Sequence, residues 1–150
     1  MGLIVVGVDH SAGAKAALRF ALDEARLRGS RLRAVHAWHV NYIGAGYLAI
    51  SQPVLDAEGY QIRDAAEAAL EATLDEVVSD TDDVEIERRV VEGAPASVLV
   101  DESRAADLLV VGSRGHGGFT GLLLGSVSQQ CAQHAECPVV IVRAPSGTSD

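Results

Sequence analysis

The chain has 150 residues, of which 48% are apolar, and its 12 lysines and arginines against 21 aspartates and glutamates give a net charge of −9 with neutral histidines. This length suits one domain spanning residues 1–150 with a substantial hydrophobic core, and the apolar fraction excludes an intrinsically disordered chain. The acidic balance argues against binding to nucleic-acid polymers or to anionic membranes, because both need a basic protein face.

Strands and helices alternate in the first half of the sequence. Residues 3–8 form a nearly unbroken apolar run, which is typical of a strand buried on both faces. Ser11 can cap a following helix, whose small and apolar residues recur at helical spacing until Gly29 stops it. A second strand is predicted over residues 32–40. Residues 41–55 have no clear period and contain glycine and proline, so a flexible loop is predicted there.

The same alternation continues to the end of the chain. An alanine-rich helix is predicted from Asp56 to about Val78, and Pro95 suits the first turn of a short helix. The remaining predicted elements are a strand over residues 84–91, the short helix over 95–104, a strand over 108–111, a helix over about 125–135, a strand over 138–142 and a tail over 144–150. This order predicts an α/β fold, a doubly wound parallel sheet of five strands with helices on both faces.

The carboxyl ends of the strands are the expected place for a ligand. In doubly wound sheets, ligands bind at that edge, near the point where the strand order reverses. The residues just after the first, second and fourth predicted strands should therefore be the informative ones.

The segment after the fourth strand has an uneven composition. Six of the fifteen glycines lie between residues 112 and 125, and no aspartate or glutamate occurs between residues 112 and 135. Arg114 is the one permanent cation of that stretch, and His116 lies nearby, where a phosphate would favour its protonated form. In a chain with a net charge of −9, a stretch without acids suits a phosphate group.

The glycines themselves allow such a ligand to approach the backbone closely. A helix that opens at Gly125, Ser126 and Val127 would direct unpaired N–H groups toward an anion. A flexible linker or a tight turn is the alternative interpretation of a glycine-rich loop. The preceding strand, the following helix and the missing acids favour phosphate binding.

Several known nucleotide and catalytic motifs are absent. The only lysine is Lys15, so the chain has no P-loop of the G-x-x-x-x-G-K-[ST] type. A dinucleotide fold would place its glycines after the first strand, where only Gly7 and Gly13 occur. The chain also lacks a G-x-S-x-G nucleophile elbow and an H-E-x-x-H zinc motif, and no catalytic residue is predicted.

Residues at the ends of the first two strands complete the set of candidates. Asp9 can accept hydrogen bonds from ribose or help to hold a metal ion, or it can cap the following helix, and the residues alone leave both roles open. Ser11 is interpreted as a cap. Ala37 is small enough for an adenine edge to reach the backbone. His36 and Trp38 are interpreted as structural residues of the second strand.

The cysteines suggest neither a disulfide scaffold nor a metal site. Cys131-x2-His134-x2-Cys137 has no evident fourth ligand, so these side chains are interpreted as packing residues and no dedicated metal site is predicted. Two cysteines are too few to hold together a small secreted scaffold. No apolar run is long enough for a signal peptide or a membrane span, and a cytoplasmic protein is expected.

One long motif resembles a known family. The spacing Gly112-x2-Gly115-x9-Gly125-Ser126 is similar to the ATP-binding motif of the universal stress protein family. Val6-Gly7-Val8-Asp9 near the start resembles the first strand and turn of that family, and Cys137-Pro138-Val139-Val140 near the end is also similar to the family's sequence. The resemblance covers nearly the whole chain. It implies an α/β fold of the adenine nucleotide alpha hydrolase-like type, with strand order 3-2-1-4-5, that binds ATP or another adenine nucleotide such as AMP.

The resemblance also implies roles for individual residues. Asp9 would contact the ribose or the Mg²⁺ that accompanies the nucleotide, and Ala37 would meet adenine through its backbone. The residues implied along the ribose and phosphate path are Gly112, Arg114, Gly115, His116, Gly125, Ser126 and Val127.

The family is typically dimeric, often through its last strand. The edge residues Val139, Val140, Ile141 and Val142 would then pair across a two-fold axis. The implied function is a nucleotide-dependent regulatory dimer that reports to an unknown protein partner, with slow or no hydrolysis because no general base is evident. The alternatives are a nucleotide-independent interaction protein of the same fold and a genuine ATPase of low turnover.

Overall fold

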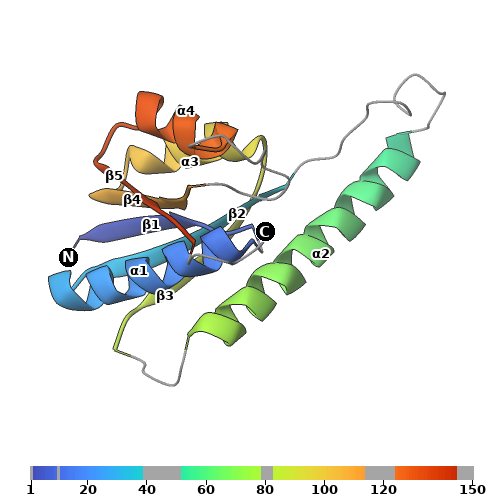
Figure 1. Cartoon of the computed structure of the whole chain (residues 1–150). Coiled ribbons are helices and arrows are strands. Elements are labelled where there is room, and N and C mark those ends of the chain that lie inside the picture. Colours follow the sequence, from blue (N-terminus) through green and yellow to red (C-terminus); the bar gives the residue numbers. More distant parts are fainter. Residues whose placement is uncertain (1, 10, 39–51, 79–82, 114–123, 145–150) are drawn as a thin grey trace.

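The computed structural model describes residues 2–9, 11–38, 52–78, 83–113 and 124–144, with the backbone alone for residues 52–61. Strands and helices alternate as the sequence predicts (Figure 1). In chain order they are β1 (Leu3–Gly7), α1 (Ala12–Arg28), β2 (Arg31–Trp38), α2 (Gln52–Val77), β3 (Ile86–Glu92), α3 (Pro95–Ser103), β4 (Leu108–Gly112), α4 (Ser126–His134) and β5 (Val139–Val142).

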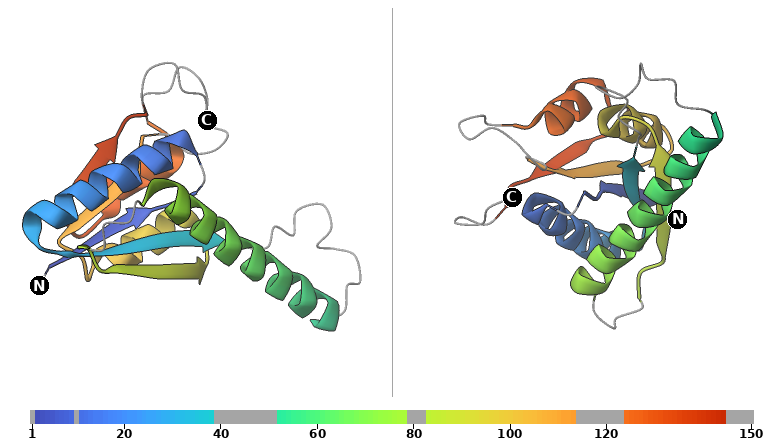
Figure 2. Two further views of the ribbon diagram at one scale, coloured as in Figure 1. Left: turned by 90° about the horizontal axis from the view of Figure 1, so that it is seen from below. Right: turned by 90° about the vertical axis from the view of Figure 1, so that its right-hand side faces the viewer.

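The strands form one parallel sheet in the order β3-β2-β1-β4-β5. Helices α1 and α2 cover one face of this sheet, and α3 and α4 cover the other (Figures 1 and 2). The doubly wound fold and the strand order implied by the family resemblance are both confirmed. The strand order reverses between β1 and β4, so a crevice is expected at their carboxyl ends.

Burial on both faces explains why the strands are apolar throughout. In β1, Ile4 and Val6 pack into the core beneath α1 and α2, whereas Leu3 and Val5 pack into the core beneath α3 and α4. Successive side chains of a strand point to opposite faces, so a strand covered by helices on both sides needs an apolar residue at each position.

One boundary of the sequence prediction is wrong. Helix α2 begins at Gln52, so the last residues of the predicted loop 41–55 are helical. Proline is typical of loops, but Pro53 occupies the first turn of the helix, where no backbone N–H is needed. Residues 41–51 of that loop and residues 145–150 of the predicted tail lie outside the described residues.

Smaller differences concern the second and third strands. Strand β3 begins at Ile86, two residues after the predicted start, because Ile86 is the first residue in register with β2 while Val84 packs into the core ahead of it. Strand β2 ends at Trp38, and the last two predicted residues of that strand, 39 and 40, are not described.

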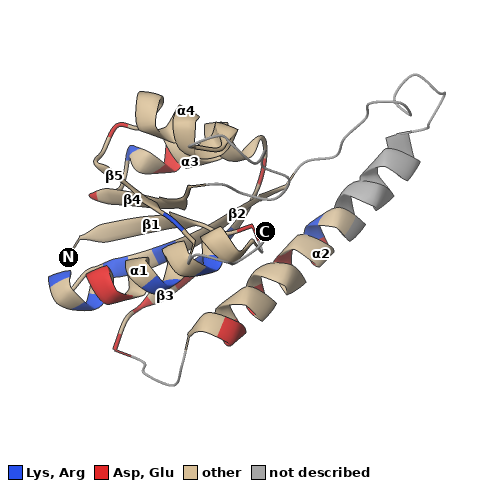
Figure 3. Cartoon of the chain, in the orientation of Figure 1, with Lys and Arg blue, Asp and Glu red and all other residues tan. Residues whose placement is uncertain are grey.

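Charged side chains on the face of the sheet that α3 covers form ion pairs with one another. Arg33 of β2 binds Glu87 of β3 at 3.1 Å and Glu102 of α3 at 2.9 Å, and Arg89 of β3 binds Glu102 at 3.2 Å. Burial alone would lower the pKa of Arg33, but its hydrogen bonds to Glu87 and Glu102 raise that pKa above the ordinary value. Helix α4, by contrast, carries no Lys, Arg, Asp or Glu (Figure 3).

Gly112, the last residue of β4, lies directly against the start of α1. A Cβ atom at this position would lie 2.8 Å from the carbonyl carbon and 2.9 Å from the carbonyl oxygen of Gly13. Both atoms belong to the backbone and cannot rotate away, so only glycine fits between β4 and α1.

The described helices include none that is both long and apolar enough to cross a membrane.

The variant Gly112→Ala should therefore lower the free energy of unfolding by about 1–3 kcal/mol, a typical cost of overpacking. Urea denaturation followed by circular dichroism measures this change. Gly7→Ala is the matched control, since its added Cβ would meet only the side chain of Leu99, which can shift, and its loss should be smaller. Equal losses in the two variants would contradict a backbone clash at Gly112.

Candidate functional site

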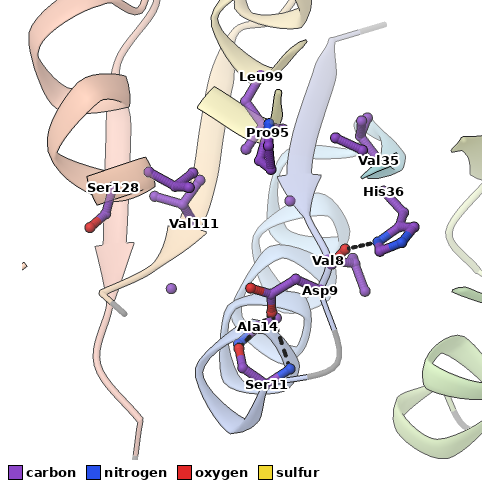
Figure 4. A pocket seen from close by; sticks show the side chains of 14 residues that line it. Val8, Asp9, Ser11, Ala14, Val35, His36, Pro95, Leu99, Val111 and Ser128 are labelled. Atoms are coloured by element: carbon purple, nitrogen blue, oxygen red, sulfur yellow. Dashed lines mark hydrogen bonds between the residues drawn. The ribbon is translucent and has the colours of Figure 1, made fainter. Parts of the chain in front are cut away.

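A cavity of about 90 Å³ lies at the carboxyl ends of β1, β2 and β4 (Figure 4). Its wall combines the turn from β1 into α1, the end of β2, and the first turns of α3 and α4. Four of the residues that the sequence analysis proposed line it, namely Asp9, Ala37, Gly112 and Val127. The cavity therefore occupies the edge of the sheet where the fold class predicts a ligand.

Asp9 lies just before α1 and accepts hydrogen bonds from Ser11, the N-cap residue of that helix. The Asp9 Oδ1 atom accepts hydrogen bonds from the Ser11 N–H at 3.1 Å and from the Ser11 hydroxyl at 2.6 Å. The Ser11 Oγ atom in turn accepts the Ala14 N–H at 3.0 Å, which makes Ser11 the cap of α1. Asp9 is thus a support of the cap rather than the cap itself, and its carboxylate lies in the cavity wall.

One part of the wall is apolar. Val35, Val111, Leu99 and Pro95 contribute hydrocarbon surface from three different strands and helices. The sequence analysis did not propose these four residues as parts of the site. Valines at strand ends look like ordinary core residues, and the contribution of α3 follows only from the way that helix crosses the sheet.

The N-terminus of α4 forms the opposite part of the site. Its cap residue is Gly125, with φ −74° and ψ 170°, and among the described residues no side chain caps the helix. The first N–H groups of a helix have no acceptor within the helix, so these amides can bind an anion. Val127 lines the cavity, while Ser126 is exposed at the first position of the helix and is not part of the lining.

Ser128 joins the two ends of the glycine-rich segment. Its hydroxyl lies 2.8 Å from the Ser113 carbonyl oxygen and 3.1 Å from the Gly125 carbonyl oxygen, and the Gly125 N–H donates to the same Ser113 carbonyl at 2.7 Å. Ser128 is buried and also lines the cavity. Ser128 is not among the candidate residues predicted from the sequence, because its bonds depend on how α4 packs against Ser113.

Three predicted residues cannot be placed. Arg114, Gly115 and His116 lie outside the described residues, so their roles remain predictions from the sequence. Within the described ranges, no group of three or more His, Cys, Asp or Glu side chains is close enough to hold a metal ion.

The two cysteines have packing roles outside the cavity. Cys131 of α4 is fully buried, and burial raises its pKa to about 11. Burial and the negative charge of Asp107 raise the pKa of the Cys137 thiol, against a hydrogen bond from the Leu109 backbone that lowers it. Cys131 belongs to the core beneath α3 and α4, and the half-buried Cys137 packs against that core.

Comparison with known sequences points to one family. The sequence model of the Universal stress protein family matches residues 1–143. A universal stress protein of Mycolicibacterium smegmatis is 39% identical over 140 residues, which are 93% of this chain and 45% of that relative. Universal stress protein Rv2005c of Mycobacterium tuberculosis is 40% identical over 140 residues, with the same two shares. The chain spans about half the length of the curated relatives it matches.

Solved structures of similar proteins include two with adenine nucleotides. Universal stress protein UspA from Lactobacillus plantarum has a TM-score of 0.76 at 24% identity, covering 95% of this chain and 97% of that one. A universal stress protein in complex with cAMP has a TM-score of 0.58 at 29% identity, with shares of 96% and 98%. The universal stress protein from Archaeoglobus fulgidus in complex with dAMP has a TM-score of 0.54 at 25% identity, with shares of 95% and 98%.

The variant Ser128→Ala should lower the free energy of unfolding by about 1 kcal/mol, because it removes a buried hydroxyl that bonds two carbonyl groups at the base of the glycine-rich segment. Thermal or urea denaturation measures the loss. Ser97→Ala, at an exposed position of α3, removes the same atom without a buried bond and should change stability by a smaller amount. Similar values for both variants would show that the Ser128 contacts contribute no stability.

Proposed function

Because the chain belongs to the universal stress protein family, we propose that it binds an adenine nucleotide, with ATP as the principal candidate, in the cavity at the ends of β1, β2 and β4. The observation that carries this proposal is the juxtaposition of three chemical surfaces in one place. The cavity brings together an apolar wall, a carboxylate at Asp9 and the N-terminus of α4, which no side chain of the described residues caps. An adenine ring, a ribose and phosphates need these surfaces in that combination.

The proposed pose follows from the chemistry of each part of the wall. The base lies between Val35 and Leu99 and reaches the backbone of Ala37, since a flat apolar ring gains most from hydrocarbon contact. The Asp9 carboxylate accepts a hydrogen bond from the ribose hydroxyls. The phosphates follow Gly112 toward the first amides of α4 at Ser126 and Val127, where the partial positive charge of the helix favours anions.

The remaining predicted contacts come from residues beyond the described ranges. Gly115 allows the backbone to approach the phosphates, Arg114 neutralises their charge, and His116 adds a second charge when it is protonated. Asp9 would be the candidate protein ligand of a Mg²⁺ ion that accompanies the nucleotide, and such an ion would neutralise part of the phosphate charge. The two complexes of relatives with cAMP and dAMP support the adenine-nucleotide class as a whole.

We propose a regulatory role with slow or no hydrolysis. Phosphoryl transfer needs a group that positions or deprotonates the attacking water, together with strong charge neutralisation. Asp9 is the one carboxylate in the lining of the described cavity, and its Oδ1 atom already accepts two hydrogen bonds from Ser11. Such a site can retain a nucleotide and report its presence, which suits a dimer that signals to a protein partner.

We propose that two copies pair through β5. This strand lies at the edge of the sheet and forms its described ladder with β4 alone. The carbonyl groups of Pro138 and Val142 accept bonds from β4, so strand alternation directs the N–H and C=O of Val139 and Ile141 to the outer edge. An exposed row of backbone groups on an apolar strand is a template for pairing with a second strand.

Nucleotide binding is tested first on the purified protein, denatured so that any bound small molecule is released for chromatography. Isothermal titration calorimetry with ATP, ADP, AMP and cAMP then compares the wild type with Gly125→Val. We expect this variant to lose nucleotide affinity by more than tenfold while it stays folded. The φ of −74° at residue 125 is open to any residue, whereas a branched side chain there covers the first amides of α4.

Ala132→Val is the matched control, because it adds the same side chain at an exposed position late in the same helix. It should bind nucleotide like the wild type. Unchanged affinity in Gly125→Val would overturn the placement of the phosphates. A wild type that releases and binds no nucleotide would favour the nucleotide-independent interaction protein, and hydrolysis well above that of Gly125→Val would favour an ATPase.

The dimer is tested by Ile141→Pro, measured by analytical ultracentrifugation. Proline removes the outward N–H of residue 141 without removing a bond to β4, so this variant should be monomeric if β5 pairs with a second copy. Ile141→Ala loses much of the same side chain but retains the N–H, and it should dimerise. A dimeric Ile141→Pro protein, or a monomeric wild type, would exclude pairing through β5.

A further inference from the structure

His36 connects the end of β2 to the end of β1 across the wall of the cavity. Its Nδ1 atom lies 2.7 Å from the carbonyl oxygen of Val8, and the ring forms part of the cavity lining (Figure 4). A carbonyl oxygen can only accept a hydrogen bond, so the Nδ1 atom must carry the hydrogen. This contact therefore defines the protonation of Nδ1 and the orientation of the ring.

The hydrogen bond acts just beyond the last paired residues of the two strands. The ladder between β1 and β2 ends with Gly7 opposite Val35, and the Val8 N–H then donates to the Val35 carbonyl at 2.9 Å. With the His36 bond added, β2 holds both backbone polar groups of Val8. Hydrogen bonds from β2 thus fix the backbone of β1 as far as Val8, the residue that precedes Asp9.

The Val8 carbonyl belongs to the peptide unit that also contains the Asp9 nitrogen. This unit is planar, so a bond that orients the carbonyl also orients the start of Asp9. Beyond Asp9, the Ser11 N–H and hydroxyl hold the carboxylate itself. Asp9 is therefore fixed from two sides, by His36 through the backbone and by Ser11 through the side chain.

We propose that His36 is a positioning residue of the nucleotide site, which sets the direction of the Asp9 carboxylate toward the ribose. This inference rests on the proposed function and adds to it a residue that acts through the orientation of Asp9. An apolar side chain of similar size could fill the same space, but it could not donate a hydrogen bond to Val8. Position 36 therefore requires a side chain that donates a hydrogen bond to the Val8 carbonyl, and a side chain of the same size without a donor is not enough.

The experiment compares two variants with the wild type by calorimetric titration with ATP. His36→Asn places an amide N–H at the same number of bonds from the backbone as Nδ1 and should bind within about twofold of the wild type. His36→Leu lacks the donor and should bind about tenfold more weakly, since one hydrogen bond of ordinary strength corresponds to that factor. His36→Phe takes the place of the leucine variant if the latter does not fold.

A double-mutant cycle with Asp9→Asn separates positioning from packing. If His36 acts through the Asp9 carboxylate, His36→Leu should cause little further loss of affinity once that carboxylate is neutral. A full tenfold loss in the Asp9→Asn background would overturn the inference, as would wild-type binding by His36→Leu or equal losses in the asparagine and leucine variants. Absence of nucleotide binding by the wild type would instead refute the proposed function, and this inference with it.

Discussion

The contact between Gly112 and the backbone of Gly13 is the constraint on which the site depends. Strands β1 and β4 are neighbours, but their chains continue to opposite faces of the sheet, β1 into α1 and β4 toward α4. At this edge of the sheet, the start of α1 lies directly against Gly112, the last residue of β4, so little space separates α1 from β4. A side chain at Gly112 would separate the two elements, and Asp9 would then face a wider and less defined space.

The uneven distribution of charge explains how an acidic chain can accommodate an anion. The net charge of −9 is a sum over the whole sequence, whereas the residues of α4 contain no acid. Acids near the sheet are paired, as in the contacts of Glu102 with Arg33 and Arg89. Charges at more than about 8–10 Å are largely screened at physiological salt, so the local absence of acids matters more than the total.

Elements with strong periodicity could be predicted from the sequence, and the residues that depend on tertiary packing could not. The apolar strands and the capped helix α1 follow from local patterns, and the strand order followed from the family resemblance. The start of α2 was missed because Pro53 is compatible with both a loop and a first helical turn. The contact of His36 with Val8 is not predictable for another reason, since the two residues lie 28 positions apart and no local pattern records that contact.

Ser113 connects the proposed phosphate site to the edge of the sheet. Its carbonyl accepts hydrogen bonds from the Gly125 N–H and the Ser128 hydroxyl at the start of α4, and its N–H donates to Val142 at the end of β5. A nucleotide held by the first amides of α4 would stabilise this residue, and with it the last rung between β4 and β5. Because β5 is also the edge proposed for pairing, nucleotide occupancy and dimerisation would share one structural element. By thermodynamic linkage, any effect of nucleotide binding on dimerisation would then be matched by the same factor in the reverse direction.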